Sequence, residues 1–469
     1  ALIADISTAV RESSPGAISL VVAPTDRQAE DLAHALRSYL DAGDIALFPA
    51  WETLPHERLS PRSDTIGRRL QVLRAMTGPT EERPRLVVVP VRALIQPIVA
   101  GIEKLQPVQL IRGKEYSFKD VVRGLSEAAY SRVDLVAKRG EYAVRGGIID
   151  VFAPPDTTPV RLEFFGDELD EMRRFSVADQ RTLNGGEDLT ELTLLPCREL
   201  LITPEVMSRA ARLKNDYPAA ASMLEKIAGG IYVEGMESLT PLLVDSMTTL
   251  IAQLPAGSMV LSVEPERVRA RAEDLVATNE EFLAAAWDTA AEADAVSPID
   301  LGQLRLSDGA FRTIDTTHTE ALEAKLSWWE ITELTTDDNL LTDAAGAIET
   351  IEALKNDAVA EAIEEGIDTY TVGARPAEAF NGSVDRMLNA VGELVHRQRT
   401  VLALTNGRGS TDRIIDLFHS GDGNGTSVPA ARRASLAADP AGELENGIVE
   451  VCEAPATSGF VLEEAKLAV

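Results

Sequence analysis

The chain has only two cysteines among its 469 residues, Cys197 and Cys452. They lie far apart and show no metal-ligand spacing, so neither a disulfide framework nor a zinc site is predicted. Such sparse use of cysteine is typical of a reducing cytoplasm. We therefore expect two inert thiols in a cytoplasmic protein.

Long hydrophobic runs are also missing. The longest apolar stretches, such as Leu86–Val89, have the length of a strand, whereas a membrane-spanning helix needs roughly twenty apolar residues. No basic segment precedes an apolar one at Ala1, so the start of the chain does not look like a secretory precursor and fits a trimmed piece. We expect a soluble protein, long enough for three or four domains.

Positive charge is scarce, because 45 Lys and Arg face 75 Asp and Glu and the formal net charge is −30. A surface of that sign repels phosphates, so non-specific binding to nucleic acid is disfavoured. Part of the excess lies in residues 336–368, where ten carboxylates face only Lys355; they are Asp337, Asp338, Asp343, Glu349, Glu352, Asp357, Glu361, Glu364, Glu365 and Asp368. We interpret this segment as an acidic connector between domains.

No phosphate-binding loop of the P-loop type is present. Gly113-Lys114 is followed by Glu115 and lacks the upstream glycine, and Phe164–Glu168 resembles a strand with an acidic Mg²⁺ motif but is more simply a strand running into a turn. Residues 406–410 fit the start of a helix better than a phosphate loop, because they include no lysine. An ATP site is therefore not predicted.

Other catalytic patterns are missing too. No nucleophile elbow occurs, and the histidines are dispersed without metal-binding spacing; they are His34, His56, His318, His396 and His419. Arg68, Arg69 and Arg74 share one predicted helix, where they fit a solvated face better than an anion site. We expect no catalytic, cofactor-binding or metal-binding residue in this chain.

The first hundred residues alternate strand and helix. Strands are predicted at 18–23, 46–48 and 85–89. Thr25 and Gln28 form a capping box that begins a helix, and this helix runs through Leu32, Leu36 and Leu40. A second helix is predicted at 66–76. This order predicts a parallel sheet with helices on its faces. From about Pro107 the pattern changes to a helix at 118–130 and closely spaced strands at 141–144, 148–153, 160–165 and 169–175, which is typical of an antiparallel α+β domain.

Helical periodicity resumes after Thr203 and continues to about Trp329. A last α/β unit follows the acidic connector. It is predicted to have a helix at 385–396, a strand at 400–405, a glycine-rich turn at 407–409 and a helix at 412–419.

The strand at 160–165 carries the most informative pattern. Side chains alternate along a strand, so Val160, Leu162 and Phe164 face one side while Arg161, Glu163 and Phe165 face the other. The first face is core. An arginine and an aromatic residue on the second are the usual anchors of a protein interface, although a second layer that covers Phe165 would explain them as well.

Several strings together resemble the N-terminal half of the bacterial transcription-repair coupling factors, the Mfd family. They follow that family's order: Phe48–Pro55 with Ser60-Pro61 and Arg68–Leu70, then Gly140–Phe152, Arg161–Glu168, Phe175 with Gln180–Leu183, and Gly230–Glu237. The resemblance is strong over roughly residues 1–330 and weak over the last α/β unit.

The resemblance implies a multidomain α/β fold. A degenerate helicase-type, RecA-like parallel-sheet domain, similar to that of the damage-recognition protein UvrB, is split by an inserted antiparallel α+β domain and followed by a small separate α/β domain. The expected boundaries are 1–106 and 191–335 for the two parts of the helicase-like domain, 107–190 for the inserted domain, 336–368 for the connector and 369–469 for the last domain.

The resemblance also implies a partner. In that family the inserted domain docks the repair protein UvrA, and the residues that carry the docking fall on Arg145, Arg161 and Phe165 here. The alternation had already placed Arg161 and Phe165 on one face. The turn at Gly146-Gly147 leaves the face of Arg145 unassigned, so its place in the site depends on the resemblance alone.

The implied function is a non-catalytic adaptor that recruits UvrA for transcription-coupled nucleotide excision repair. The parent protein would displace stalled RNA polymerase by ATP-driven translocation on DNA. Its motor domains, with their ATP and Mg²⁺, and its polymerase-binding domain are expected beyond Val469, so RNA polymerase and DNA would be partners only through those domains.

Two alternatives stay open. One is a UvrB-like DNA-damage ATPase with an unorthodox nucleotide site, although this chain lacks a P-loop and has no tyrosine between Tyr39 and Tyr116 for the tyrosine-rich hairpin of UvrB. The other is an autoinhibitory cover that packs on the parent's own motor and C-terminal domains.

Overall fold

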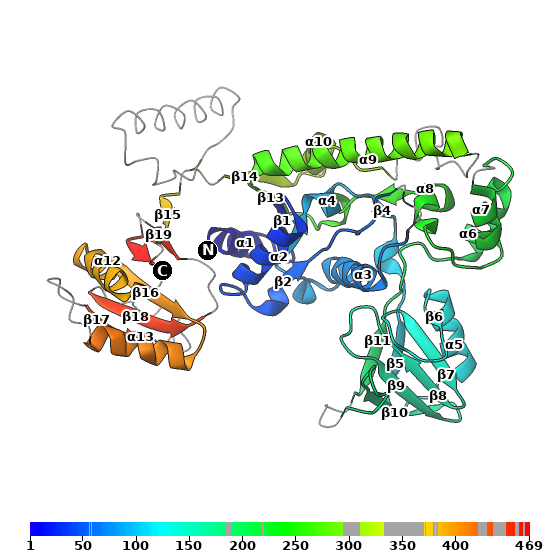
Figure 1. Ribbon diagram of the computed structural model, residues 1–469, viewed down its shortest axis with the longest axis horizontal. Coiled ribbons are helices and arrows are strands. Elements are labelled where there is room, and N and C mark those ends of the chain that lie inside the picture. The colour runs from blue at the N-terminus through cyan, green and yellow to red at the C-terminus, as the bar shows by residue number, and fades with distance from the viewer. Residues whose placement is uncertain are drawn as a thin grey trace. The chain divides into compact units, whose positions relative to one another are not determined.

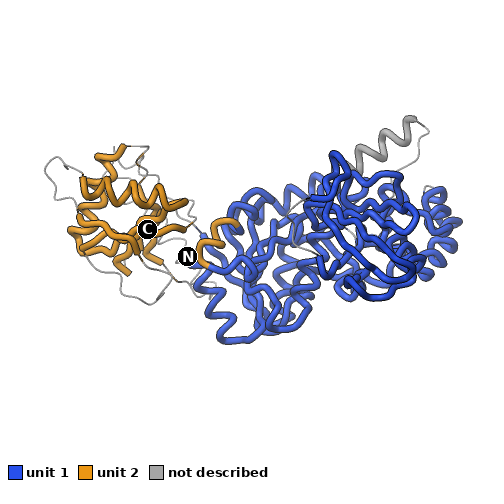
Figure 2. Tube along the Cα trace, turned by 90° about the horizontal axis from the view of Figure 1, so that it is seen from below, with its two compact units in different colours: residues 1–33, 40–332 blue, residues 34–39, 333–469 orange. Residues whose placement is uncertain are grey.

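The structure is a computed structural model (Figure 1). It describes residues 1–332 and 370–469, apart from gaps at 56, 58, 184–188, 218–219, 294–309, 371, 379, 381–382, 421–428, 435–446, 455–458 and 463–464, and it gives only the backbone for 282–293. The predicted acidic connector, residues 336–368, lies outside the described residues. The chain divides into two compact units, residues 1–33 with 40–332 and residues 34–39 with 333–469 (Figure 2).

A five-stranded parallel sheet forms the centre of the first unit, in the order β14-β13-β1-β3-β2. Its strands are β1 (Ser19–Ala23), β2 (Ile45–Leu47), β3 (Leu86–Pro90), β13 (Met259–Val263) and β14 (Ser327–Ile331). Every residue of β1 and β3 is buried, as expected for central strands of a parallel sheet that is covered on both faces. The predicted parallel sheet is confirmed.

Several helices pack around this sheet (Figure 1). They are α1 (Leu2–Ser13), α2 (Asp26–Leu36), α3 (Ser63–Thr77), α4 (Val91–Leu94), α9 (Pro265–Ala293) and α10 (Ile314–Glu323). The Thr25 hydroxyl accepts a hydrogen bond from the Gln28 backbone N–H at 3.3 Å and caps α2 as predicted. The helix ends at Leu36, so the expected extension to Leu40 is wrong.

The expectation of helical periodicity from Thr203 to about Trp329 is wrong where strands form, and two of these strands belong to the parallel sheet. Residues 259–263 form β13, and residues 327–331 form the edge strand β14. The sequence of β13 could not be recognised as a strand because the strand is buried. A short apolar run has no amphipathic period that distinguishes a buried strand from a buried helix. These two strands supply two of the five strands of the parallel sheet.

The inserted domain is an antiparallel α+β unit, as predicted. Its main sheet has the order β10-β9-β8-β7-β6, with antiparallel pairing from β7 to β10. The strands are β6 (Ser131–Arg132), β7 (Glu141–Arg145), β8 (Ile148–Val151), β9 (Val160–Phe165) and β10 (Glu168–Arg174). Helix α5 (Phe118–Glu127) covers one face, and the entering strand β5 (Val108–Ile111) pairs with the leaving strand β11 (Glu191–Leu194).

The inserted domain is held against α3. The Ser63 hydroxyl donates to the Arg139 carbonyl at 2.8 Å, and the Arg139 guanidinium lies 3.8 Å from the Asp64 carboxylate. A Cβ at Gly67 would lie only 2.4 Å from the Pro154 Cβ, so glycine permits α3 to touch the β8–β9 connection. This contact orients the inserted domain on the parallel-sheet body.

A helical segment follows the inserted domain in the chain. It contains α6 (Pro204–Leu213), α7 (Ala221–Ala228) and α8 (Thr240–Leu243), and these surround a core of their own. Strand β12 (Met247–Thr248) pairs with β4 (Ile98–Val99).

The second unit is a separate α/β domain around a six-stranded sheet of order β15-β19-β20-β16-β18-β17. Its elements are β15 (Ala374–Pro376), α12 (Val384–His396), β16 (Thr400–Thr405), α13 (Arg408–Ser420), β17 (Ala430–Arg433), β18 (Ile448–Glu453), β19 (Phe460–Leu462) and β20 (Leu467–Ala468). The predicted strand and both helices are confirmed, except that α13 begins at Arg408 within the predicted turn.

Among the helices that the structure describes, none has the length and apolarity needed to cross a membrane. The described residues contain no cluster of three His, Cys, Asp or Glu side chains that is arranged to hold a metal ion.

Candidate docking face of the inserted domain

The two faces of the β7–β10 sheet differ in what covers them. Residues paired directly across antiparallel strands point to the same side. On one side, buried Ile149, Leu162 and Met172 pack beneath α5, where the Phe118 and Phe164 rings meet edge to face with centroids 5.2 Å apart. The opposite side, which we call the docking face, consists of Ala143, Arg145, Ile148, Asp150, Arg161, Glu163, Phe165, Glu168, Glu171 and Arg173.

Strand register now assigns Arg145. It pairs with Ile148, which in turn pairs with Glu163, two residues before Phe165 on β9. All three residues that the sequence singled out therefore share one face. Arg145 and Phe165 both lie next to hairpin turns at the same end of the sheet, while Arg161 lies nearer its middle.

Arg161 is anchored rather than free. Its Nε and Nη2 donate to the two oxygens of the Asp150 carboxylate at 2.7 and 2.8 Å, and its guanidinium lies over the Phe175 ring at 5.0 Å. Asp150 is only 4% exposed. The hydrogen bonds with this carboxylate raise the pKa of Arg161 above its already high ordinary value, so the side chain stays charged.

Phe165 is uncovered. Its side chain is 83% exposed, the highest exposure among the large apolar residues that the structure describes. It ends β9 beside Gly166, whose φ of 67° turns the chain into β10. The alternative in which a second layer of the domain buries Phe165 is therefore wrong, and Phe164–Glu168 is the strand and turn predicted for it.

A second layer does cover the other end of the docking face. Val136 and Phe175 are fully buried there against Ala143 and Phe152, beneath the loops that follow β6 and β10. One end of the face is therefore closed: it is covered by Val136 and Phe175, and the Phe175 ring supports the Arg161 guanidinium. The other end is open and leaves Phe165 and Arg145 accessible. A rigid platform with accessible aromatic and guanidinium groups can bind a protein surface.

Asp150 and Phe175 hold Arg161 in place, and alternation along one strand did not reveal them. Both lie on neighbouring strands or just after them, so they become visible only through cross-strand pairing. The connection between β8 and β9 spans residues 152–159, so its length alone does not set the register that brings Asp150 opposite Arg161.

The first strand-to-helix connection has no room for a phosphate loop. Strand β1 ends at Ala23 and α2 begins at Asp26, which leaves only Pro24 and Thr25 between them. A P-loop needs eight residues whose backbone N–H groups surround the phosphates, and proline has no N–H. Gly113, in contrast, belongs to the inserted domain, where its N–H donates to the Leu169 carbonyl.

The three arginines of α3 form neither an anion site nor a solvated face. Arg69 is fully buried, 2.5 Å from Glu199 and over the Phe48 ring at 4.3 Å. Arg74 donates to the Leu105 carbonyl at 2.8 Å, and only Arg68 is exposed. Both predictions for Arg69 are wrong, because the sequence does not show the buried carboxylate that comes from 130 residues away.

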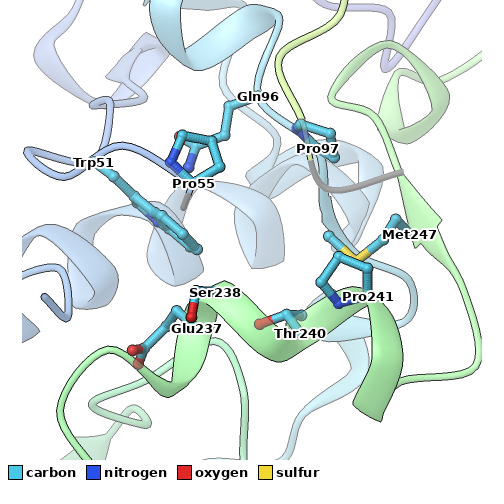
Figure 3. A pocket seen from close by; sticks show the side chains of 9 residues that line it. All are labelled: Trp51, Pro55, Gln96, Pro97, Glu237, Ser238, Thr240, Pro241 and Met247. Atoms are coloured by element: carbon cyan, nitrogen blue, oxygen red, sulfur yellow. The ribbon is translucent and has the colours of Figure 1, made fainter. Parts of the chain in front are cut away.

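A small pocket lies between the body and the helical segment. Trp51 and Pro55 face Thr240, Pro241 and Met247 across it (Figure 3). Its volume of about 20 Å³ has room for roughly one water molecule, whereas ligand pockets measure hundreds of cubic ångströms. The pocket is therefore no candidate for a nucleotide site.

The inserted domain matches a known family. The family profile described as "UvrB interaction domain" matches residues 108–200, which include every residue of the docking face. Transcription-repair-coupling factors of Mycobacterium bovis and Mycobacterium tuberculosis are each 45% identical to the chain over 344 residues, 70% of this chain and 28% of the relative. That of Haemophilus influenzae is 31% identical over 256 residues, covering 53% of this chain and 22% of the relative.

The chain thus spans less than a third of the length of these relatives. The similarity covers most of the chain, and the relatives share one name. With 45% identity over 70% of its residues, the chain fits the N-terminal region of the transcription-repair-coupling factors.

Proposed function

We propose that this chain is a non-catalytic adaptor that recruits UvrA for transcription-coupled nucleotide excision repair, and that UvrA binds the open end of the docking face. The observation that carries the proposal is the side chain of Phe165, which is 83% exposed on the same face as Arg145 and Arg161. An aromatic ring that is exposed to solvent on a rigid sheet can serve as an interface anchor, because a partner can bury its apolar surface.

The energetics of binding at this face are favourable. Burying an aromatic side chain in a partner's pocket removes its apolar surface from water, and no conformational change is needed first because β9 already fixes the backbone. Asp150 holds Arg161 in one orientation, so little side-chain entropy remains to be lost on binding.

The adaptor has no nucleotide chemistry in this proposal. The two-residue connection after β1 supports that part, since it offers no cradle for phosphates. Displacement of RNA polymerase and ATP-driven translocation on DNA, with ATP and Mg²⁺, are placed in the parts of the full-length protein to which this chain does not align. ATP turnover by the purified chain above a buffer control would contradict this assignment.

The test is a titration of the chain with purified UvrA, followed by calorimetry or fluorescence. We expect Phe165→Ala to weaken binding by about thirtyfold, which corresponds to about 2 kcal/mol, because the variant removes the central apolar anchor. Its unfolding midpoint should match that of the unmodified chain, since Phe165 makes little contact with the domain.

Leu322→Ala is the matched control. Leu322 is 54% exposed on α10, outside the inserted domain, so its truncation removes similar exposed apolar surface without touching the face. Unchanged UvrA affinity in Phe165→Ala, or an equal loss in Leu322→Ala, would refute the docking face.

A further inference from the structure

The loop after β6, residues 133–140, is held next to the docking face by hydrogen bonds and by one buried side chain. The Val133 N–H donates to the Tyr142 carbonyl at 2.9 Å, and Val136 is fully buried in the closed end of the face. The Ala137 and Lys138 N–H groups both donate to the Glu141 carboxylate at 2.8 Å. The backbone of this loop is therefore fixed on both sides of its middle.

Leu135 occupies that middle, and its side chain is 47% exposed. The carbonyl of the preceding residue, Asp134, accepts a hydrogen bond from Nη2 of Arg145, so the arginine reaches from the docking face to the peptide bond before Leu135. An exposed leucine on a fixed backbone loses little conformational entropy when a partner buries it. It is the kind of apolar anchor that Phe165 provides at the open end of the face.

We infer that Leu135 is a second apolar anchor for UvrA, and that Arg145 contributes to binding partly by fixing the loop that presents it. The inference depends on the proposed function and extends it to residues outside the strands. The partner surface should then have two apolar pockets. Strands lie about 4.8 Å apart, so β7, which carries Arg145, and β9, which carries Phe165, are separated by about 10 Å.

The partner's chemistry next to Arg145 follows from its guanidinium rather than from the net charge of the face, which also carries Glu163 and Glu171. Arg145 is exposed and has guanidinium N–H groups beyond the one that Asp134 engages. A carboxylate or a cluster of backbone carbonyls on UvrA between the two pockets would complement it. A flat or purely basic patch would not.

The experiment measures UvrA affinity for single and double variants. Leu135→Ala should weaken binding by about tenfold, while the matched control Ile111→Ala, which truncates a 45% exposed side chain on β5, should not. Combining Leu135→Ala with Arg145→Ala should cost less than the product of the two single losses, because the arginine acts partly through that loop. Combining Leu135→Ala with Phe165→Ala should give close to the full product, because the two anchors are separate.

The outcomes separate this inference from the proposed function. Wild-type affinity in Phe165→Ala would overturn both. A loss in Phe165→Ala with wild-type affinity in Leu135→Ala would overturn only the inference, and so would a fully multiplicative effect of Leu135→Ala with Arg145→Ala. Because Leu135 is exposed, its truncation should leave thermal unfolding unchanged, so a loss of binding cannot be assigned to misfolding.

Discussion

Two regions of the molecule use the same arrangement of side chains for different ends. In the parallel-sheet body, Arg69 lies over the Phe48 ring and pairs with Glu199. In the inserted domain, Arg161 lies over the Phe175 ring and pairs with Asp150. Each arginine thus stacks on an aromatic ring and pairs with a carboxylate. In both regions the carboxylate comes from a different element than the arginine.

The difference between the two regions is exposure. The side chains of Arg69 and Glu199 are 0% and 2% exposed, so every group of that pair faces protein. Arg161 is 22% exposed above a 5% exposed Asp150, so part of its guanidinium reaches solvent. We therefore expect the same pairing to act as an internal brace in the body and, on the docking face, to support an arginine that a partner can reach. Charge and residue type alone do not distinguish the two roles.

The largest effect is expected from breaking the internal brace. Arg69→Ala leaves Glu199 buried without its cation and should lower the free energy of unfolding by about 3–5 kcal/mol. Chemical denaturation measures the loss. Arg68→Ala, one position earlier on the exposed side of α3, is the control and should change stability by less than about 0.5 kcal/mol.

If Arg69→Ala unfolded at the same denaturant concentration as Arg68→Ala, the comparison would fail, because the buried pair would then have no structural role. Binding of UvrA by the fraction that remains folded should be unchanged, since Arg69 is enclosed in the body and does not reach the docking face.

Arg161→Ala should have a smaller and mixed effect. It removes an anchor, so UvrA binding should weaken by about thirtyfold. It also leaves Asp150 without its partner, so the free energy of unfolding should fall by about 1–3 kcal/mol. The buried carboxylate therefore makes this substitution affect stability as well as binding.

The double variant Arg161→Ala with Asp150→Asn separates the two effects. Removing the carboxylate's charge should restore part of the stability, because a neutral amide is less costly to bury than an unpaired carboxylate. It should not restore UvrA binding, since the guanidinium is still missing. Recovery of both would show that Arg161 only supports the fold.

Much of the fold was predictable because its signals are local. The helix that follows β1 begins where the Thr25 cap predicts, and the strand at 160–165 is observed with those bounds. Strands β13 and β14 were missed because they are short and surrounded by helices, so a tertiary pairing rather than a local period defines them. The sheet could be predicted as parallel but not as five-stranded.

The candidate site was predictable in part for the same reason. Alternation along β9 is local, and it placed Arg161 and Phe165 on one face. The partner of Arg161 comes from the neighbouring strand, the aromatic ring beneath it from the loop after β10, and the loop with Leu135 from before β7. Such contacts depend on register and loop path, which a single sequence does not specify.

The smallest effect is expected in the binding of duplex DNA. Its affinity tests whether any exposed arginine in the body contacts phosphates. Non-specific affinity grows with the number of phosphates that Lys and Arg neutralise, and the chain carries −30 net charge. On α3 the apparent basic stripe is lost, because Arg69 is buried and Arg74 is engaged with the Leu105 carbonyl, which leaves only Arg68 exposed. We therefore expect duplex DNA to bind no more tightly than roughly 10⁻⁴ M at physiological salt, as measured by fluorescence anisotropy at several salt concentrations. Micromolar binding that falls steeply with salt would contradict this, and a loss of that binding in Arg68→Ala would then locate a phosphate contact on the body.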